Sequence, residues 1–250
     1  MNDTIRQLLS HRTIRAFLDR PVEEEKVQLI LDAGRHASTS MGMQAFSIIR
    51  VKDEGIKKAV GEITGQPYSA AAPEWFLIVL DLCRNRAIVE EEGKTFTGAG
   101  DFYTFIQAFM DGAIAAQNMA VAAESLGLGI CYFGSVFQDM KRLAALTKLP
   151  PLTFPLTGLG MGYPAISPME KPRLPEKVQV FTDHYKEEAS YLAALKDYDK
   201  EMAKYVDTRH PDTTVPPFTV SVTHRNTGST ETGEKTFRLL KDQGFTWADK

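Results

Sequence analysis

Apolar residues near the start of the chain recur with a helical spacing. In TIRQLLS (4–10) they lie at positions i, i+3 and i+4, behind Asn2 or Asp3, either of which can cap a helix that runs to about residue 10. A second stripe extends over 27–34, after Pro21 and three glutamates that suit the positive end of a helix dipole. We therefore expect two amphipathic helices in this region.

Longer apolar runs follow and predict buried strands. There are four of them: FSIIRV (46–51), WFLIVLDL (75–82), LGICYFG (128–134) and the glycine-rich FPLTGLGMGYPA (154–165). Residues 101–126 carry small and apolar side chains on most faces, which is typical of a buried central helix, and another helix is expected over 137–146. Helices first, then strands separated by helices of unequal length, favour an α+β fold.

The last third of the chain is more polar. KPRLPE (171–176) is held extended by its two prolines, and 184–206 is amphipathic. Residues 207–250 are weakly patterned and include a short helix that ends near Gly244. Because no internal repeat or break in composition divides the sequence, we expect a single domain over 1–250.

The composition mainly excludes certain classes of protein and of binding site. With 43% hydrophobic and 24% charged residues, the 250-residue chain is typical of a globular protein. Its net charge of −3 gives no general attraction to nucleic acid or an anionic membrane, and no apolar run is long enough to span a bilayer. Cys83 and Cys131 lack metal-binding spacing, and the N-terminus does not resemble a signal peptide, so we expect a cytoplasmic protein without disulfides or a metal site.

Several motifs of known enzyme classes are absent from the sequence. No GxGxxG follows a strand, GLGMG (158–162) lacks the spacing of a Rossmann loop, and there is no P-loop, HExxH or GxSxG. The carboxylates show no pairing that indicates an acid/base dyad. These absences disfavour a Rossmann fold and hydrolytic chemistry.

Four segments remain as candidates, and each has a plainer interpretation. HRTIR (11–15) offers guanidinium groups and a hydroxyl to a phosphate, but alone it is more typical of a basic helix end. KPR (171–173) alone is more often a solvated loop, and STS (38–40) a turn. The backbone of 129–134 could approach a planar ligand beside its glycines, but alone it is more often a bent buried strand.

Taken together in this order, the segments resemble one family. HRTIR, ASTSxxxQxxSII, TGQ, AAQNMAVAAESLGLGICYFG, GLGMGYPA and KPRLP are similar to the FMN-dependent nitroreductase superfamily, and more narrowly to its oxygen-insensitive NADPH nitroreductase and flavin reductase subgroup, over about residues 4–206. The resemblance implies an α+β sandwich in which helices cover both faces of a central mixed antiparallel sheet. It also implies an intertwined homodimer, with 101–126 as the dimer helix and 207–250 as an extension on the partner subunit.

The same resemblance assigns residues to FMN. His11, Arg12, Thr13 and Arg15 would grip the phosphate and ribityl chain, Lys171 and Arg173 would complete the cationic pocket, and Ser38, Thr39 and Ser40 would reach the flavin across the interface. Gln66 would lie near the isoalloxazine edge, and Tyr132, Phe133, Gly134 and Ser135 beneath the ring, with a backbone amide near Gly134 at flavin N5. The flavin itself does the chemistry, so no separate catalytic residue is expected.

The implied activity is an FMN-dependent NAD(P)H oxidoreductase. Hydride would pass from NADPH or NADH to flavin N5, and then in a ping-pong reaction to nitroaromatics, quinones or flavins. Two alternatives remain open: a flavin reductase that supplies reduced FMN to a partner enzyme, and a flavin-binding protein without turnover. A nucleic-acid module using HRTIR is disfavoured, because the chain has no basic balance or basic stripe.

Two positions depart from the subgroup pattern. Ser135 stands where close relatives often carry a second glycine. Arg209 matches the first of two arginines that bind the 2′-phosphate of NADPH, but the second is missing, and Thr213 and Thr214 occupy the equivalent region. Losing a charged partner of a phosphate weakens binding by about 1.5–3 kcal/mol. The choice between NADPH and NADH is therefore open, as is the physiological electron acceptor.

Overall fold

The computed structural model describes residues 1–228 and 231–249. These divide into two compact units. The core unit comprises residues 1–9, 13–166 and 231–249, and the second unit comprises residues 10–12 and 167–228. The prediction of one domain over 1–250 stays a prediction.

The core unit is built on a four-stranded sheet with the order β1-β2-β4-β3. Its strands are β1 (Phe46–Arg50), β2 (Glu74–Asp81), β3 (Gly129–Phe133) and β4 (Thr153–Gly162). All four predicted strands are confirmed, with small shifts at their ends. Neighbouring strands are antiparallel, and the parallel component in the described residues is an isolated bridge between Thr13 and Ile130.

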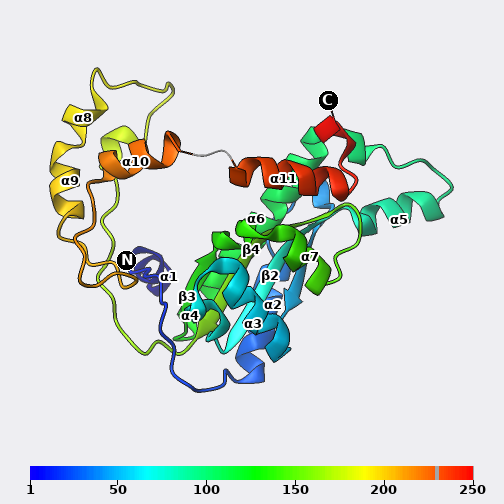
Figure 1. The fold of residues 1–250 in the computed structure, drawn as a ribbon, viewed down its shortest axis with the longest axis horizontal. Helices are drawn as coiled ribbons and strands as arrows, with labels where there is room; N and C mark the ends of the chain where they lie inside the picture. The colour runs from blue at the N-terminus through cyan, green and yellow to red at the C-terminus, as the bar shows by residue number, and fades with distance from the viewer. Residues whose placement is uncertain (229–230, 250) are drawn as a thin grey trace. The chain divides into compact units, whose positions relative to one another are not determined.

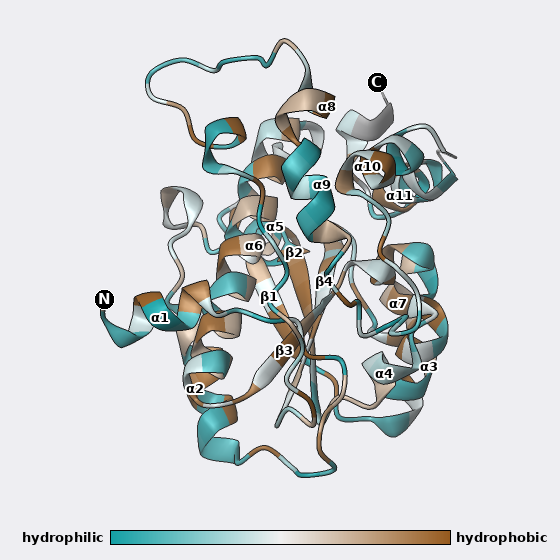
Figure 2. Cartoon of the chain, turned by 90° about the vertical axis from the view of Figure 1, so that its left-hand side faces the viewer, coloured by the Kyte–Doolittle hydropathy of each residue, from teal (hydrophilic) through white to brown (hydrophobic). Residues whose placement is uncertain are grey.

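Helices cover both faces of this sheet, as the predicted sandwich requires (Figure 1). One face packs α2 (Glu24–Arg35) and the long α6 (Phe102–Ser125) against Phe76, Ile78 and Leu80 of β2. The other face packs α3 (Glu54–Thr64) and α7 (Met140–Leu146) against Trp75, Leu77 and Val79. Strand β2 is buried along its whole length because alternate side chains enter the two cores, and Figure 2 draws it largely brown.

The remaining elements of the core unit are short or peripheral. They are α1 (Asp3–Leu9), α4 (Pro67–Ala70), α5 (Cys83–Glu91), α11 (Glu231–Asp242) and the 3-10 helices η1 (Ser40–Gly42), η2 (Gly98–Gly100), η3 (Gly134–Gln138) and η5 (Thr246–Asp249). Helices α3 and α5 were not predicted from the sequence. For α3 the signals were present, because Asp53 caps its first turn through the amide of Ile56 and Gly65 ends it with a φ of 62°.

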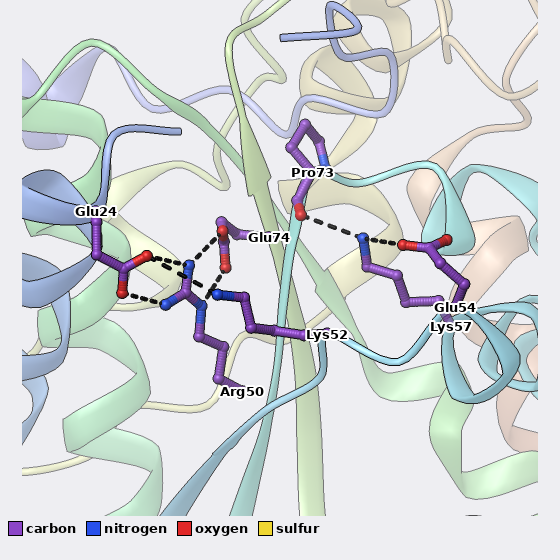
Figure 3. Close-up of polar contacts among 7 residues, drawn as sticks. All are labelled: Glu24, Arg50, Lys52, Glu54, Lys57, Pro73 and Glu74. Carbon is purple, nitrogen blue, oxygen red and sulfur yellow. Dashed lines mark hydrogen bonds and ion pairs between the residues drawn. The ribbon is translucent and has the colours of Figure 1, made fainter. Parts of the chain in front are cut away.

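An ion-pair cluster ties α2 to the sheet (Figure 3). The guanidinium of Arg50, at the end of β1, donates to both carboxylate oxygens of Glu74 at 2.7 Å and also binds Glu24 at the start of α2. Beside it, Lys57 of α3 donates to the carbonyl of Pro73 at 3.2 Å. The Arg50 guanidinium is the largest cause that lowers the pKa of Glu24. The cluster therefore fixes the end of the sheet from which β2 begins.

The second unit is small and helical. It contains η4 (Glu176–Val178), α8 (Tyr191–Ala194), α9 (Lys196–Met202) and α10 (Phe218–Asn226). Of the predicted extended segment 171–176, residues 171–175 form no helix or strand, and Glu176 already belongs to η4. The amphipathic stretch 184–206 becomes two short helices. Leu195, Tyr198 and Met202 form its buried cluster, against which Phe218 packs.

The C-terminal segment contributes to the core of its own chain. Leu239 and Leu240 of α11, together with Phe245, are buried in the same cluster as Phe105 of α6. The predicted helix ending near Gly244 is confirmed. Packing of 207–250 on a partner subunit stays a prediction. In the part of the chain that the structure describes, no helix combines the length and apolarity needed to cross a membrane.

Candidate functional site

The HRTIR segment enters the core unit along the edge strand of the sheet. Thr13 forms a parallel bridge with Ile130 of β3, and the amide of Ile14 donates to the carbonyl of Ile130 at 2.8 Å. Gly129 makes this approach possible, because a Cβ there would lie 2.4 Å from Cγ1 of Ile14. The backbone just before the half-buried Arg15 is thus held by β3, and the backbone after it is held by the segment that follows β4, since Phe17 forms a bridge with Pro164.

Tyr163 fixes the chain where it leaves this segment. Its carbonyl accepts from the amide of Leu18 at 2.8 Å, while its hydroxyl donates to Glu23 at 2.5 Å and accepts from Lys26 at 2.8 Å. The guanidinium of Arg20 lies 3.9 Å from the centre of the Tyr163 ring. The hydrogen bond from Tyr163 is the largest cause that lowers the pKa of Glu23 to about 2.

The end of β3 gathers further predicted residues. Strand β3 ends at Phe133, and Gly134 and Ser135 begin η3. The ring of Phe133 packs against Tyr68 of α4 at 5.8 Å between centroids, and Gln66 immediately precedes α4. The core unit therefore brings Thr13, Gln66 and the Tyr132–Ser135 strand end to the β3 edge of the sheet.

One hydroxyl at this strand end is buried and lacks a hydrogen-bond partner. It is Oγ of Ser135, which finds no partner among the described residues. Buried polar atoms are normally paired, so an unpaired one beside a predicted ligand site indicates a polar group that the chain itself does not supply.

Tyr132 lies on the other side of the same strand end. Its hydroxyl donates to Oε1 of Gln117 on α6 at 3.3 Å. Burial, and then the charge of Glu124, raises the pKa of Tyr132 above its ordinary value. Tyr132 therefore remains a neutral phenol throughout the physiological pH range.

The STS segment lies elsewhere in the core unit, after α2. Ser38 is exposed, whereas Thr39 and Ser40 are half-buried. In the described residues, no hydrogen bond or ion pair joins this segment to the Tyr132–Ser135 strand end. A single chain therefore leaves the STS segment without a polar link to that strand end, and its contact with a flavin across a dimer interface stays a prediction.

The second unit holds other predicted flavin residues. Arg12 donates from Nη1 to Oγ of Ser167 at 3.1 Å and from Nη2 to Glu170 at 2.8 Å, while its Nε is buried without a partner among the described residues. Lys171 and Arg173 are exposed, and Nη1 of Arg173 donates to the carbonyl of Lys171 at 2.7 Å. His11 is half-buried. The sequence did not indicate that Glu170 would form an ion pair with Arg12.

Arg209, the predicted nucleotide residue, lies in the same unit and is engaged by a carboxylate. Its Nε lies 3.1 Å from Oδ1 and 3.0 Å from Oδ2 of Asp207, and its Nη2 also donates to Oδ2. The Asp207 side chain is only 15% exposed. Asp207 therefore competes with any approaching phosphate for the guanidinium of Arg209.

Comparison with known proteins supports a common fold and family. A family model described as "Nitroreductase family" matches residues 8–163, and one described as "Nitroreductase family, C-terminal domain" matches residues 171–248. The FMN reductase (NADPH) of Bacillus subtilis (strain 168) is 34% identical over 212 residues, which cover 84% of this chain and 85% of that one.

Solved structures agree with this comparison. NfrA1 from B. megaterium superposes with a TM-score of 0.90 at 34% identity, covering 97% of this chain and 99% of that chain. The NADPH:FMN oxidoreductase from Vibrio harveyi, solved in complex with NAD+, superposes with a TM-score of 0.84 at 30% identity, covering 97% and 98%. The match therefore extends over both units of the chain.

Proposed function

Because this chain belongs to the nitroreductase family, we propose that it is an FMN-dependent oxidoreductase that takes hydride from NADPH or NADH and reduces a small acceptor in a ping-pong reaction. The acceptors are nitroaromatics, quinones or free flavins. Bound FMN would supply the hydride chemistry, since it accepts two electrons from one substrate and returns them to the next.

The observation that carries the proposal is the gathering of Thr13, Gln66 and the Tyr132–Ser135 strand end at the β3 edge. Two buried polar atoms have no hydrogen-bond partner in the described part of the chain. One is Oγ of Ser135 at this strand end, and the other is Nε of Arg12 in the second unit. A hydroxyl and a guanidinium N–H are groups that the polar ring edge and the phosphate of FMN can pair. The residues present therefore fit this cofactor.

The protein's own groups would bind FMN and orient it. In the proposal, the cations bind the phosphate, the hydroxyls bind the phosphate or ribityl chain, and the strand end supports the ring. These residues are His11, Arg12, Thr13, Arg15, Lys171 and Arg173; Ser38, Thr39 and Ser40; and Gln66, Tyr132, Phe133, Gly134 and Ser135. Arg12 would bind more weakly than a free guanidinium, because Glu170 already neutralises part of its charge.

A homodimer is part of the same proposal. Helix α6 carries a run of exposed large apolar side chains that a monomer would leave in water: Phe102, Tyr103, Ile106, Phe109, Met110 and Ile114. Counted from the first of them, these lie at i, i+1, i+4, i+7, i+8 and i+12, which is one broad stripe of the helix. Pairing of two α6 stripes would cover them. The cytoplasm as location rests on the two cysteines, neither of which is in a disulfide.

The test of the proposal is the colour of the purified protein and its response to reductant. The protein should be yellow with FMN bound, and should bleach under anaerobic conditions when NADPH or NADH is added. A protein that binds no FMN would contradict the proposal. A yellow protein that neither nucleotide bleaches would be a flavin-binding protein without turnover.

A flavin reductase is the second candidate function, and the similarity to the FMN reductase (NADPH) of Bacillus subtilis favours it. The ratio of kcat/KM for free FMN to that for nitrofurazone separates the two activities. A much larger value for free FMN would make flavin reduction the main activity.

A further inference from the structure

Asp111 is a buried carboxylate within the otherwise small and apolar helix α6. The residue is only 1% exposed. Its neighbours one turn away, Ala108 and Ala115, are buried alanines, which suit close packing. Placing a carboxylate there costs free energy unless both oxygens are paired. Packing of α6 therefore does not explain this residue.

The partners of Asp111 are the two ends of one loop. Oδ1 accepts from the amide of Ser40 at 2.7 Å, and Oδ2 accepts from the amide of Ala45 at 3.1 Å. Hydrogen bonds from backbone amides to an ionised carboxylate are stronger than those between neutral groups. The carboxylate thus holds the loop 40–45 from both ends, and this loop begins at the last residue of the STS segment.

The loop needs such support, because its backbone is strained. Met41 and Gln44 have φ angles of 52° and 48°, in the left-handed region that favours glycine. Each such residue costs about 1 kcal/mol or more. The side chains of Met41 and Met43 are exposed and contribute little packing to offset this cost. Without Asp111, other loop conformations would become competitive.

We propose that Asp111 is a positioning residue for the flavin: its carboxylate fixes the 40–45 loop on helix α6 and so presents Ser40 and its neighbouring hydroxyls to FMN. The inference rests on the proposed function, since it assumes that the STS segment contacts FMN. It goes further by linking that segment to the helix whose exposed stripe would form the dimer. Asp111 would thus couple the geometry of α6 to the affinity for FMN.

The test combines two measurements on Asp111→Asn. The asparagine keeps the size of the side chain but turns one acceptor into a donor that faces an amide. The apoprotein is titrated with FMN by flavin fluorescence, and hydrogen exchange of residues 38–46 is followed by mass spectrometry. The Kd for FMN should rise about tenfold or more, as loss of a hydrogen bond to a charged group implies. Exchange should accelerate in residues 38–46 and not in the middle of α6.

Asp101→Asn is the matched control. Asp101 also lies at α6 and also accepts from two backbone amides, those of Tyr103 at 3.0 Å and Thr104 at 3.2 Å. These amides belong to the first turn of the helix itself and not to the loop. The control should therefore leave the Kd for FMN within about twofold and leave exchange in 38–46 unchanged, since N-cap loss acts locally.

Each outcome decides the inference. A weaker Kd together with faster loop exchange supports it. An unchanged Kd, or a weaker Kd with unchanged loop exchange, overturns it while the proposed function stands. If the wild-type protein binds no FMN, both are overturned. Should Asp111→Asn not fold, exchange in the wild-type apoprotein is measured residue by residue: slow exchange at Ser40 and Ala45 is expected, and fast exchange at both overturns the inference.

Discussion

Asp207 holds Arg209 through a two-point ion pair within three residues of chain. Nε of Arg209 lies 3.1 and 3.0 Å from the two carboxylate oxygens, and Nη2 shares one of them. The chain thus carries its own anion at the position where the resemblance expects the 2′-phosphate of NADPH. With Thr213 and Thr214 in place of a second arginine, this pair makes the segment a weaker phosphate site than a doubly basic one.

Replacing Asp207 should therefore favour NADPH. In Asp207→Asn the guanidinium of Arg209 gains a neutral neighbour, and kcat/KM for NADPH should rise about tenfold or more relative to that for NADH, the size of one charge-assisted contact. Steady-state kinetics with both nucleotides and one acceptor measure the ratio. An equal change for both nucleotides would show that Asp207 does not compete with the 2′-phosphate.

Removing Arg209 should have the opposite effect. Arg209→Ala should raise the KM for NADPH more than the KM for NADH, because only NADPH carries the phosphate. The same kinetic assay applies, with Arg225→Ala as the control for a general loss of positive charge in the second unit. Parallel changes in the two KM values would remove the assigned role of Arg209.

A methyl group at residue 129 should disturb the HRTIR segment. In Gly129→Ala the new Cβ would lie within 3 Å of Cγ1, Cβ and Cγ2 of Ile14, so the edge segment has to move as a whole. Overpacking of this kind costs about 1–3 kcal/mol of unfolding free energy. FMN retention after desalting should fall with it.

The control for this substitution is Gly233→Ala, where a Cβ meets no atom within 4 Å. It lies in α11 and should leave both stability and FMN retention unchanged or slightly improved. Similar losses in the two variants would show that the contact between Gly129 and Ile14 has no special part in holding the segment.

Glu23 gives a pH-dependent prediction. Its pKa falls from an ordinary value of 4.5 to about 2 in the folded chain, first because Tyr163 donates to it. A lowered folded-state pKa contributes stability that is present above pH 4.5 and is lost as the pH falls toward about 2. The difference in Tm between wild type and Glu23→Gln should therefore shrink over this interval. A difference that stays constant across it would rule out the ionised Glu23–Tyr163 contact.

The strands and the long helix were predictable because each is a continuous run of apolar or small residues, and such a run indicates a buried element. WFLIVLDL reads as a fully buried strand, and it is one, since β2 is buried on both faces. Helix α3 was missed even though Asp53 and Gly65 mark its ends. Its interior, IKKAVGEI, carries lysines that dilute the apolar pattern, so the caps were the clearer signal.

The predicted site depends on contacts that sequence patterns do not carry. Arg12 is bound by Glu170, and Asp111 by the amides of Ser40 and Ala45, across long stretches of chain. The sequence does show that Asp111 is an acidic residue in an apolar helix. The residues near it in the sequence do not indicate which groups it binds. The tail beyond 207 shows the same limit, because burial of Phe245 in its own core depends on contacts with distant residues.

Hydride transfer through bound FMN is tested most directly by an anaerobic stopped-flow experiment on the purified holoenzyme. The flavin absorbance near its visible maximum is followed, first after mixing with NADPH or NADH, and then after mixing the reduced protein with a quinone or nitroaromatic. If FMN carries the hydride from the nucleotide to the acceptor, both half-reactions should occur separately, and each should be at least as fast as kcat. Reduction that requires the acceptor to be present, or a flavin that is never reduced, would contradict it.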